Sequence, residues 1–511
     1  MAHEALLEEY EARRAKALAG GGEDKYAKRK AAGVWTARER IAYLVDPDSF
    51  IESGLFGSSG VYPEQADETQ TDGKLAGYGR INGRDAAIVV NDFTVKGAST
   101  SYTNSRKIAH MKRTATERGM PLVVIGESTG ARLPDAMGSR GMGLLLGNDN
   151  TQFRRTRETP MCAAAFGPSF GSSTWLMCQA DFAVMQKGAT MAVSSPRLVS
   201  MALGEKIDAE ALGGWRLHAE ITGLVDQVVD KEEEVFDAIK TFLSYLPSHH
   251  NEAPPEATVP AGSGAEIDKV FSILPESRTQ VYDMRRVVKC IVDKDTTFEI
   301  KPRFGKSALT ALARLGGKTV GIVANNPLHR GGALDADACR KIVDFLVLCD
   351  SFNVPIVLLV DTPGFQIGTE AEKAGAPGRI MNFMNAMTLL TVPRLSVIIR
   401  KSYGRAYVCM GGGRHSDDIA AWPTAEVSFM SPEFATKIVH GVGAGEPGFD
   451  EKFAQIQKGS DVWGLASVYA AQAVIRPEQT RDYLIRMLEV YKLRITKGVG
   501  QHLMRNWPTS Y

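Results

Sequence analysis

The segment GESTGARLPD, residues 126–135, follows the apolar run MPLVVI and contains Gly126, Ser128 and Gly130 in the pattern G-x-S-x-G. In hydrolases this pattern places a nucleophilic serine on a sharp turn between a strand and a helix. Such a turn needs a helix to begin at once, and Pro134 in its LPD context fits that requirement poorly. No histidine is positioned by the sequence to act as the base. A serine hydrolase is therefore the weakest of the functions that we consider.

A second loop, DTPGF at residues 361–365, is similar to the D-x-x-G of a GTPase switch, and GGKT at 316–319 hints at a phosphate-binding loop. A phosphate-binding loop requires a glycine five residues before Gly317, but Leu312 stands there. Because the phosphate cradle is absent from the sequence, a nucleotide hydrolase is not expected.

The two loops share a simpler property, which is that a buried strand ends and glycine lets the backbone turn with its N–H groups free. The next apolar strand also ends in a glycine loop in each case, FGPSFGSS at 166–173 and KSYGRA at 401–406. Two such loops can converge their N–H groups on one carbonyl oxygen and form an oxyanion hole from backbone alone. The alternative is that the glycines only allow tight packing of strand on helix. The occurrence of matching loops in both halves favours a site.

The elements that carry these loops occur twice in the chain. Segments of the first half match segments of the second half at an offset of 234 residues, which slips by one residue in the last pair: 83–93 with 317–327, 120–130 with 354–364, and 159–177 with 392–410. The last pair sets Gly171 over Gly404. An offset that is kept through several elements indicates an internal duplication.

The strands that these segments predict, such as AAIVV, PLVVI and PIVLLV, are apolar on both faces. That pattern is typical of a layered α/β fold and not of a half-exposed antiparallel sheet. Residues 247–266 are rich in Pro, Gly, Ala and Glu and have the composition of a linker. The sequence therefore predicts an N-terminal domain over 1–250 and a C-terminal domain over 267–511.

Bulk composition excludes several classes of protein. The 511 residues include 60 basic and 59 acidic residues, and this balance argues against a nucleic-acid binder. No apolar run approaches the roughly 20 residues that a membrane span needs, so we expect no membrane association. The six cysteines are scattered without a C-x-x-C pair, which argues against a zinc ribbon and a disulfide framework. We expect a reducing, cytoplasmic setting.

The segment GPSFGSSTWLMCQADFAVM, residues 167–185, resembles the second oxyanion segment of the crotonase superfamily. The whole chain resembles the carboxyltransferase β subunit of biotin-dependent acyl-CoA carboxylases, the propionyl-CoA and acetyl-CoA carboxylase group. The segments that carry this resemblance run nearly from end to end: 36–50, 77–99, 204–226, 282–288, 320–327, 359–365, 400–407 and 421–430.

The resemblance implies two tandem domains of the crotonase (ClpP/crotonase) type in a homohexamer, with active sites between the N-half of one subunit and the C-half of another. The N-terminal domain is expected to bind acyl-CoA and the C-terminal domain carboxybiotin. The chain has no A-M-K-M biotin-attachment motif and no ATP-grasp signature. It is therefore expected to depend on a biotin carboxylase and a biotin carboxyl carrier, as separate subunits or as one fused chain.

The resemblance also assigns site residues, all of them through backbone N–H groups. A hole for the thioester enolate is assigned to Gly130, Ala131, Gly171 and Ser172. A hole for the ureido oxygen of carboxybiotin is assigned to Gly364, Phe365, Arg405 and Ala406. No side-chain base and no metal is needed for this chemistry, and Ser128 is expected to contribute its backbone position and not its hydroxyl.

Several positions depart from the family pattern. Thr129 and Arg405 stand where the family usually has glycine, and LPDA at 133–136 replaces I-Q-E-G. Val408 occupies a position where propionyl-type enzymes commonly carry Asp, which predicts a different acyl pocket. These changes keep two alternatives open, a biotin-dependent acyl-CoA decarboxylase or transcarboxylase subunit and a non-catalytic scaffold.

Overall fold

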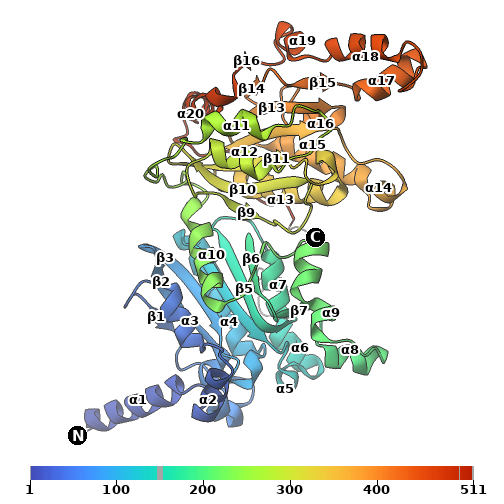
Figure 1. The fold of residues 1–511 in the computed structure, drawn as a ribbon. Coiled ribbons are helices and arrows are strands. Elements are labelled where there is room, and N and C mark those ends of the chain that lie inside the picture. Colours follow the sequence, from blue (N-terminus) through green and yellow to red (C-terminus); the bar gives the residue numbers. More distant parts are fainter. Residues whose placement is uncertain (1, 147–152, 494, 509–511) are drawn as a thin grey trace. The chain divides into compact units, whose positions relative to one another are not determined.

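A computed structural model describes residues 2–146, 153–493 and 495–508 of the chain. The chain divides between His249 and His250 into two units, which we call unit 1 and unit 2. Each unit is built on an eight-stranded sheet with helices on its faces (Figure 1). This arrangement confirms the predicted α/β fold and its internal duplication.

The sheet of unit 1 has the strand order β1-β2-β3-β4-β5-β6-β8, and β7 pairs with β5 beyond the end of β6. Strands β1 to β3 are antiparallel neighbours, whereas all later pairings are parallel. The strands are β1 (Ile51–Ser53), β2 (Lys74–Ile81), β3 (Arg84–Asn91), β4 (Leu122–Ser128), β5 (Met161–Phe170), β6 (Phe182–Gln186), β7 (Thr190–Ala192) and β8 (Gln227–Val229).

The sheet of unit 2 repeats this topology, with the order β9-β10-β11-β12-β13-β14-β16 and β15 paired to β13. Its strands are β9 (Phe298–Ile300), β10 (Ala308–Leu315), β11 (Lys318–Asn325), β12 (Ile356–Thr362), β13 (Arg394–Tyr403), β14 (Asp418–Ala421), β15 (Glu426–Ser428) and β16 (Ala473–Val474). Because β3, β4 and β5 are parallel, as are β11, β12 and β13, the carboxyl ends of these strands meet at one edge of each sheet.

The helices of unit 1 cover both faces of its sheet. They are α1 (Ala2–Leu18), α2 (Glu23–Ala31), α3 (Ala37–Leu44), α4 (Tyr102–Arg118), α5 (Leu133–Ala136), α6 (Gly138–Leu146), α7 (Ser172–Gln179), α8 (Pro196–Leu203), α9 (Ala209–Gly213) and α10 (Glu232–Tyr245). Ala87 and Val89 of β3 pack with Ile108 of α4, and Phe166 of β5 stacks on Phe236 of α10. Alternate residues of the strands thus face different helices, which explains why the strands are apolar throughout.

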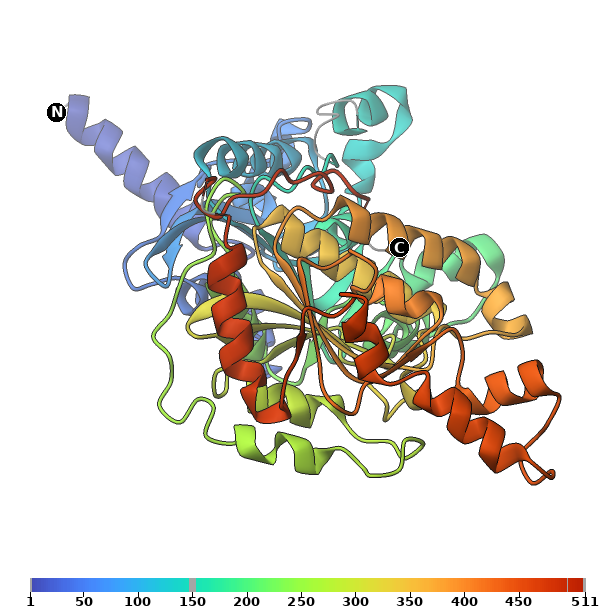
Figure 2. The same cartoon turned by 90° about the horizontal axis from the view of Figure 1, so that it is seen from above.

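Unit 2 is layered in the same way. Its helices are α11 (Val270–Ile273), α12 (Met284–Ile291), α13 (Ala336–Ser351), α14 (Thr369–Lys373), α15 (Ala376–Leu389), α16 (Arg405–Cys409), α17 (Pro432–His440), α18 (Phe449–Lys458), α19 (Val462–Ser467) and α20 (Thr480–Tyr491). Figure 2 shows the fan of strands with α11 and α12, in green, on one side of it. Ile322 of β11 packs with Val288 of α12 and Leu484 of α20 in one buried cluster, which also contains Trp422.

A buried ion pair fixes α3 on the sheet of unit 1 close to the end of β4. Arg40 of α3 is 1% exposed, and its guanidinium contacts Glu127 of β4 at 2.7 Å and Glu232 of α10 at 2.9 Å. Burial alone would raise the pKa of Glu127, but Arg40 and Arg29 outweigh that effect and hold this pKa below its usual value. Glu127 is therefore ionised and depends on its partners.

We expect Arg40→Met to destabilise unit 1, because it leaves Glu232 and part of the charge of Glu127 buried without a partner. The loss is expected to be about 3–5 kcal/mol, which lowers the midpoint of thermal unfolding by roughly 10 °C. Arg38→Met is the control, since Arg38 pairs with Glu52 but remains 35% exposed, and we expect it to cost less than about 1 kcal/mol. An equal decrease of the unfolding midpoint in the two variants would contradict this interpretation.

Candidate active site

The first glycine loop of unit 1 begins where β4 ends and leaves one amide free. Gly130 has a φ of 97°, and its carbonyl accepts from the Thr100 amide at 2.8 Å. The Arg132 amide returns a bond to the Thr100 carbonyl, also at 2.8 Å. The Gly130 carbonyl and the Ala131 N–H belong to one trans peptide group, in which N–H and C=O point in opposite directions. Because the carbonyl points to Thr100, the Ala131 N–H points away from it. Within the described part of the chain it donates to no acceptor.

The second loop of unit 1 lies directly against the first. Gly171, with φ 63° and ψ −120°, follows β5, and α7 begins at Ser172. The Ser172 amide lies in the first turn of α7 and has no intrahelical acceptor. A Cβ atom built on Gly171 would lie 3.7 Å from the Cα of Gly130. The structure thus brings the predicted residues Gly130, Ala131, Gly171 and Ser172 together.

Unit 2 repeats the first loop with the same hydrogen bonds. The Leu334 amide donates to the Gly364 carbonyl at 3.0 Å, and the Gln366 amide donates to the Leu334 carbonyl at 2.8 Å. Gly364 has a φ of 123°, which only glycine adopts readily. The Phe365 N–H therefore points away from Leu334, as the Ala131 N–H points away from Thr100.

The second loop of unit 2 also meets the first. Gly404, with φ 60° and ψ −146°, follows β13, and α16 begins at Arg405. A Cβ atom built on Gly364 would lie 3.8 Å from the carbonyl oxygen of Tyr403. The Arg405 and Ala406 amides occupy the first turn of α16. The Arg405 side chain is exposed, and Val408 is half-buried on the same helix.

Ser128 is fully buried, and its hydroxyl holds the first loop in shape. The Oγ donates to the Ala98 carbonyl at 3.1 Å and accepts from the Gly130 amide at 3.2 Å. The equivalent Thr362 hydroxyl of unit 2 accepts from the Gly364 amide at 3.1 Å. A short helix, α5, begins at Leu133 with Pro134 in its first turn, five residues after Ser128 and not at once as the nucleophile turn requires. The contacts of the hydroxyl also argue against a nucleophile.

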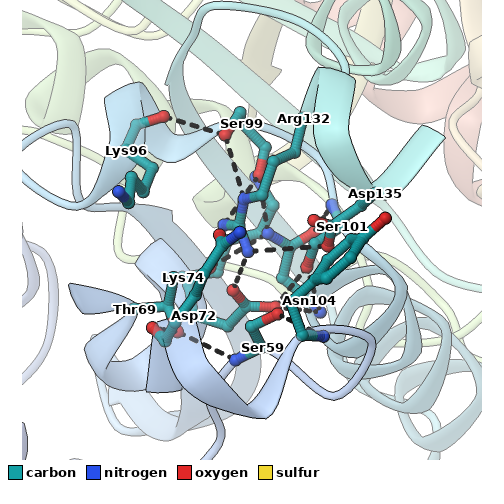
Figure 3. A network of polar contacts seen from close by, with 12 residues as sticks. Ser59, Thr69, Asp72, Lys74, Lys96, Ser99, Ser101, Asn104, Arg132 and Asp135 are labelled. Carbon is teal, nitrogen blue, oxygen red and sulfur yellow. Dashed lines mark hydrogen bonds and ion pairs between the residues drawn. The ribbon is translucent and has the colours of Figure 1, made fainter. Parts of the chain in front are cut away.

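Buried charged residues that the sequence analysis missed support the first loop of unit 1 (Figure 3). Arg132 donates to Asp72 Oδ1 at 2.6 Å. Asp72 Oδ2 accepts from the backbone N–H of Asn104 at 3.1 Å and from the Ser101 hydroxyl. Asp72 and Arg132 are 0% and 4% exposed. Their contacts hold the first turn of α4 against Arg132, which follows the loop. The only signal in the sequence was the position of Arg132 directly after the loop.

Unit 2 supports its first loop with a different set of charges. Asp361, next to the end of β12, accepts from Arg400 Nε at 3.0 Å, from the Tyr282 hydroxyl at 2.9 Å and from the Lys401 amide at 3.2 Å. Burial and the charge of Asp361 both raise the pKa of Tyr282, so its phenol stays protonated and donates. These contacts join β12 and β13 just before their glycine loops.

No group of three or more His, Cys, Asp or Glu side chains in the described residues could hold a metal ion. The described residues form no disulfide. None of the described helices is both long and apolar enough to span a bilayer.

Comparison with known proteins gives the family. Residues 28–499 match the model of the carboxyl transferase domain. The chain belongs to the carboxyl transferase family. It is 33% identical to the carboxyltransferase subunit of propionyl-CoA carboxylase from Haloferax mediterranei, over 96% of this chain and 97% of that one. It is 32% identical to the alpha subunit of methylmalonyl-CoA decarboxylase from Veillonella parvula, over 93% of each chain.

A solved structure supports the same assignment. The 12S transcarboxylase, a hexamer determined with methylmalonyl-CoA and methylmalonic acid bound, superposes with a TM-score of 0.89 and 32% identity, over 96% of each chain. The predicted resemblance is thereby confirmed, and with it the two-domain crotonase-like fold. The chain is a biotin-dependent carboxyltransferase of the acyl-CoA carboxylase and transcarboxylase group.

We expect Ser128→Ala to lower the rate of carboxyl transfer by no more than about a hundredfold, because it removes two hydrogen bonds worth about 0.5–1.5 kcal/mol each. Thr362→Val, the equivalent change in unit 2, is expected to have a similar effect. A fluorophosphonate reagent should not label the wild-type protein. A loss of several orders of magnitude with Ser128→Ala, together with labelling of Ser128, would show that the serine is a nucleophile.

Proposed function

We propose that this carboxyltransferase moves the carboxyl group of carboxybiotin, carried on a partner protein, to the α-carbon of a short acyl-CoA. The observation that carries the proposal is the repeated pair of glycine loops, each with amides that lack an acceptor in the described chain. Amides held in this way stabilise negative charge on an oxygen without any movement at the moment of reaction. Two such holes fit a reaction in which two different carbonyl oxygens gain negative charge.

In unit 1, the Ala131 and Ser172 amides donate to the thioester oxygen of the acyl-CoA. Loss of the α-proton then places negative charge on that oxygen, where the two donors stabilise it. The enolate attacks CO2, which forms the new C–C bond and restores the thioester carbonyl. The N-terminal domain is thus the proposed acyl-CoA domain, and Val408 of the other domain is proposed to influence which acyl chain is accepted.

In unit 2, the Phe365 and Arg405 amides donate to the ureido oxygen of the carboxybiotin substrate, assisted by Ala406. Their hydrogen bonds favour cleavage of the bond between the ureido nitrogen and the carboxyl carbon, because the electron pair left on nitrogen is shared with the oxygen. The CO2 goes to the enolate, and the nitrogen accepts the α-proton. The chain therefore needs no side-chain base, which agrees with the hydrogen-bonded state of Ser128.

The partners that follow from this reaction are a biotin carboxylase and a biotin carboxyl carrier. The proposed assembly is a homohexamer, by analogy with the 12S transcarboxylase. The likeness to the methylmalonyl-CoA decarboxylase subunit favours a second candidate function, decarboxylation or transcarboxylation by the same loops in reverse.

A screen of acyl-CoA substrates with a carboxybiotinylated carrier, followed by mass detection of the product, tests the function and its direction. Formation of a carboxylated acyl-CoA supports the proposal. Loss of CO2 from a carboxylated acyl-CoA, with no net carboxylation, would favour the second candidate. The absence of any transfer in either direction would identify the chain as a non-catalytic scaffold.

The two proposed holes can be separated with glycine variants. Gly171→Ala forces alanine into a backbone conformation that only glycine adopts readily, and we expect it to lower kcat for transfer by about 10²–10³ by displacing the Ser172 amide. Release of CO2 from carboxybiotin without acyl-CoA should be unchanged in this variant. Gly404→Ala, the equivalent change in unit 2, should lower both the rate of carboxyl transfer and the rate of CO2 release. Equal loss of both rates in the folded Gly171→Ala variant would contradict the division of roles.

A further inference from the structure

A lysine that is fully enclosed lies behind the two loops of unit 1. Lys74 is the first residue of β2 and the direct cross-strand partner of Asn91 on β3. Its side chain is 2% exposed, and its ammonium group donates to Asn91 Oδ1 at 3.0 Å and to the Ala98 carbonyl at 3.2 Å. Burial lowers the pKa of Lys74 to about 7, although the charge of Asp72 opposes this shift. Figure 3 shows Lys74 beside Asp72 and Arg132.

One of these two acceptors, the Ala98 carbonyl, connects Lys74 with the first loop. The Ala98 carbonyl that accepts from Lys74 also accepts from the Ser128 hydroxyl at 3.1 Å. That hydroxyl in turn accepts from the Gly130 amide at 3.2 Å. Three hydrogen bonds therefore connect the ammonium group with the residue that precedes the Ala131 amide.

The other acceptor, the Asn91 side chain, connects Lys74 with both loops. An ammonium group can only donate, so Lys74 fixes the oxygen of the Asn91 amide on its own side. The Asn91 NH2 group then faces the loops, where it donates to the Glu127 carbonyl at 3.1 Å and to Ser173 Oγ at 3.4 Å. Glu127 lies in the strand before the first loop, and Ser173 lies in the first turn of α7, next to Ser172. One cation thus orients groups on either side of the candidate hole.

Unit 2 lacks this device, although its loops have the same backbone. Ala308 occupies the position of Lys74, 234 residues further along the chain. Without a cation, Asn325 turns its oxygen to the Asp361 amide, which donates at 3.1 Å, and its Nδ2 has no partner among the described residues. Among the described residues, a lysine bonded to this asparagine is therefore found in unit 1, which in our proposal carries the full negative charge of an enolate, and not in unit 2.

We propose that Lys74, in its protonated form, is a positioning residue of the acyl-CoA hole, which holds both amide loops in register and places a positive charge behind them. This inference rests on the proposed function. The charge favours an anion at the amides over a neutral thioester, so the contribution of Lys74 increases as the enolate forms. Lys107 and Arg132 add positive charge nearby, and Asp72 and Asp135 partly balance it.

The test compares the binding of two CoA analogues by calorimetry. One carries a nitroalkane that ionises to a nitronate, an anionic mimic of the enolate, and the other is the neutral thioether S-ethyl-CoA. We expect Lys74→Met to weaken nitronate binding about tenfold or more, the loss of one charge-assisted interaction, and to change the affinity for S-ethyl-CoA by less than about twofold. A purely structural role would weaken both equally.

Lys341→Met is the matched control, because Lys341 is also a buried lysine. It is 1% exposed, and burial lowers its pKa to about 7. It donates to the Phe304 and Ala308 carbonyls at 3.1 and 2.8 Å and to no glycine loop. We expect this variant to lose stability but to keep the wild-type preference for the nitronate.

The outcomes distinguish the inference from the function on which it rests. If the wild-type protein does not prefer the nitronate to S-ethyl-CoA, the proposed acyl-CoA hole is wrong. If the wild type prefers the nitronate and Lys74→Met retains that preference, the role of Lys74 is wrong. Lys74→Gln, which keeps one donor without the charge, provides the second variant if Lys74→Met does not fold, and it should show the same selective loss.

Discussion

The free amides of this protein depend on one constraint, that the two polar groups of a trans peptide point in opposite directions. In each unit the carbonyl of a glycine, Gly130 or Gly364, is bonded to a neighbouring segment, and the next amide is thereby turned outward. Parallel strands bring the second loop to the same edge of the sheet, where Gly171 or Gly404 begins a helix with more free amides. In our proposal the donors are backbone groups, and the side chains around them are free to diverge.

The two units show that divergence. Unit 1 supports its loops with Lys74, Asp72 and Arg132, whereas unit 2 uses Asp361 with partners on β13. The hydroxyls of Ser128 and Thr362, by contrast, make the same bond in both units. The groups that shape the amides are therefore shared, and the charges behind them differ. This is what we expect if one duplicated scaffold stabilises two anions of different chemistry.

Much of the fold could be predicted from the sequence because buried parallel strands are apolar throughout, and the offset of 234 residues survives in them. The glycine loops could be located because φ values such as that of Gly364 need glycine. The buried charges could not be predicted, since nothing in DGK at 72–74 indicates that Asp72 meets Arg132, 60 residues further along the chain. The helix that begins at Leu133 was not predicted either, although proline is tolerated in a first turn.

The most direct measurement of the central claim is kcat for carboxyl transfer after the Phe365 amide has been replaced by an ester, by incorporation of phenyllactic acid. This change deletes one N–H and keeps the side chain. The same replacement at Phe449 is the control, because the Phe449 amide donates to the Glu446 carbonyl at 3.2 Å and belongs to neither glycine loop. The account predicts a loss of about 10²–10³ in kcat for the Phe365 ester and a much smaller loss for the control. An unchanged kcat in the Phe365 ester, or equal losses in both, would contradict it.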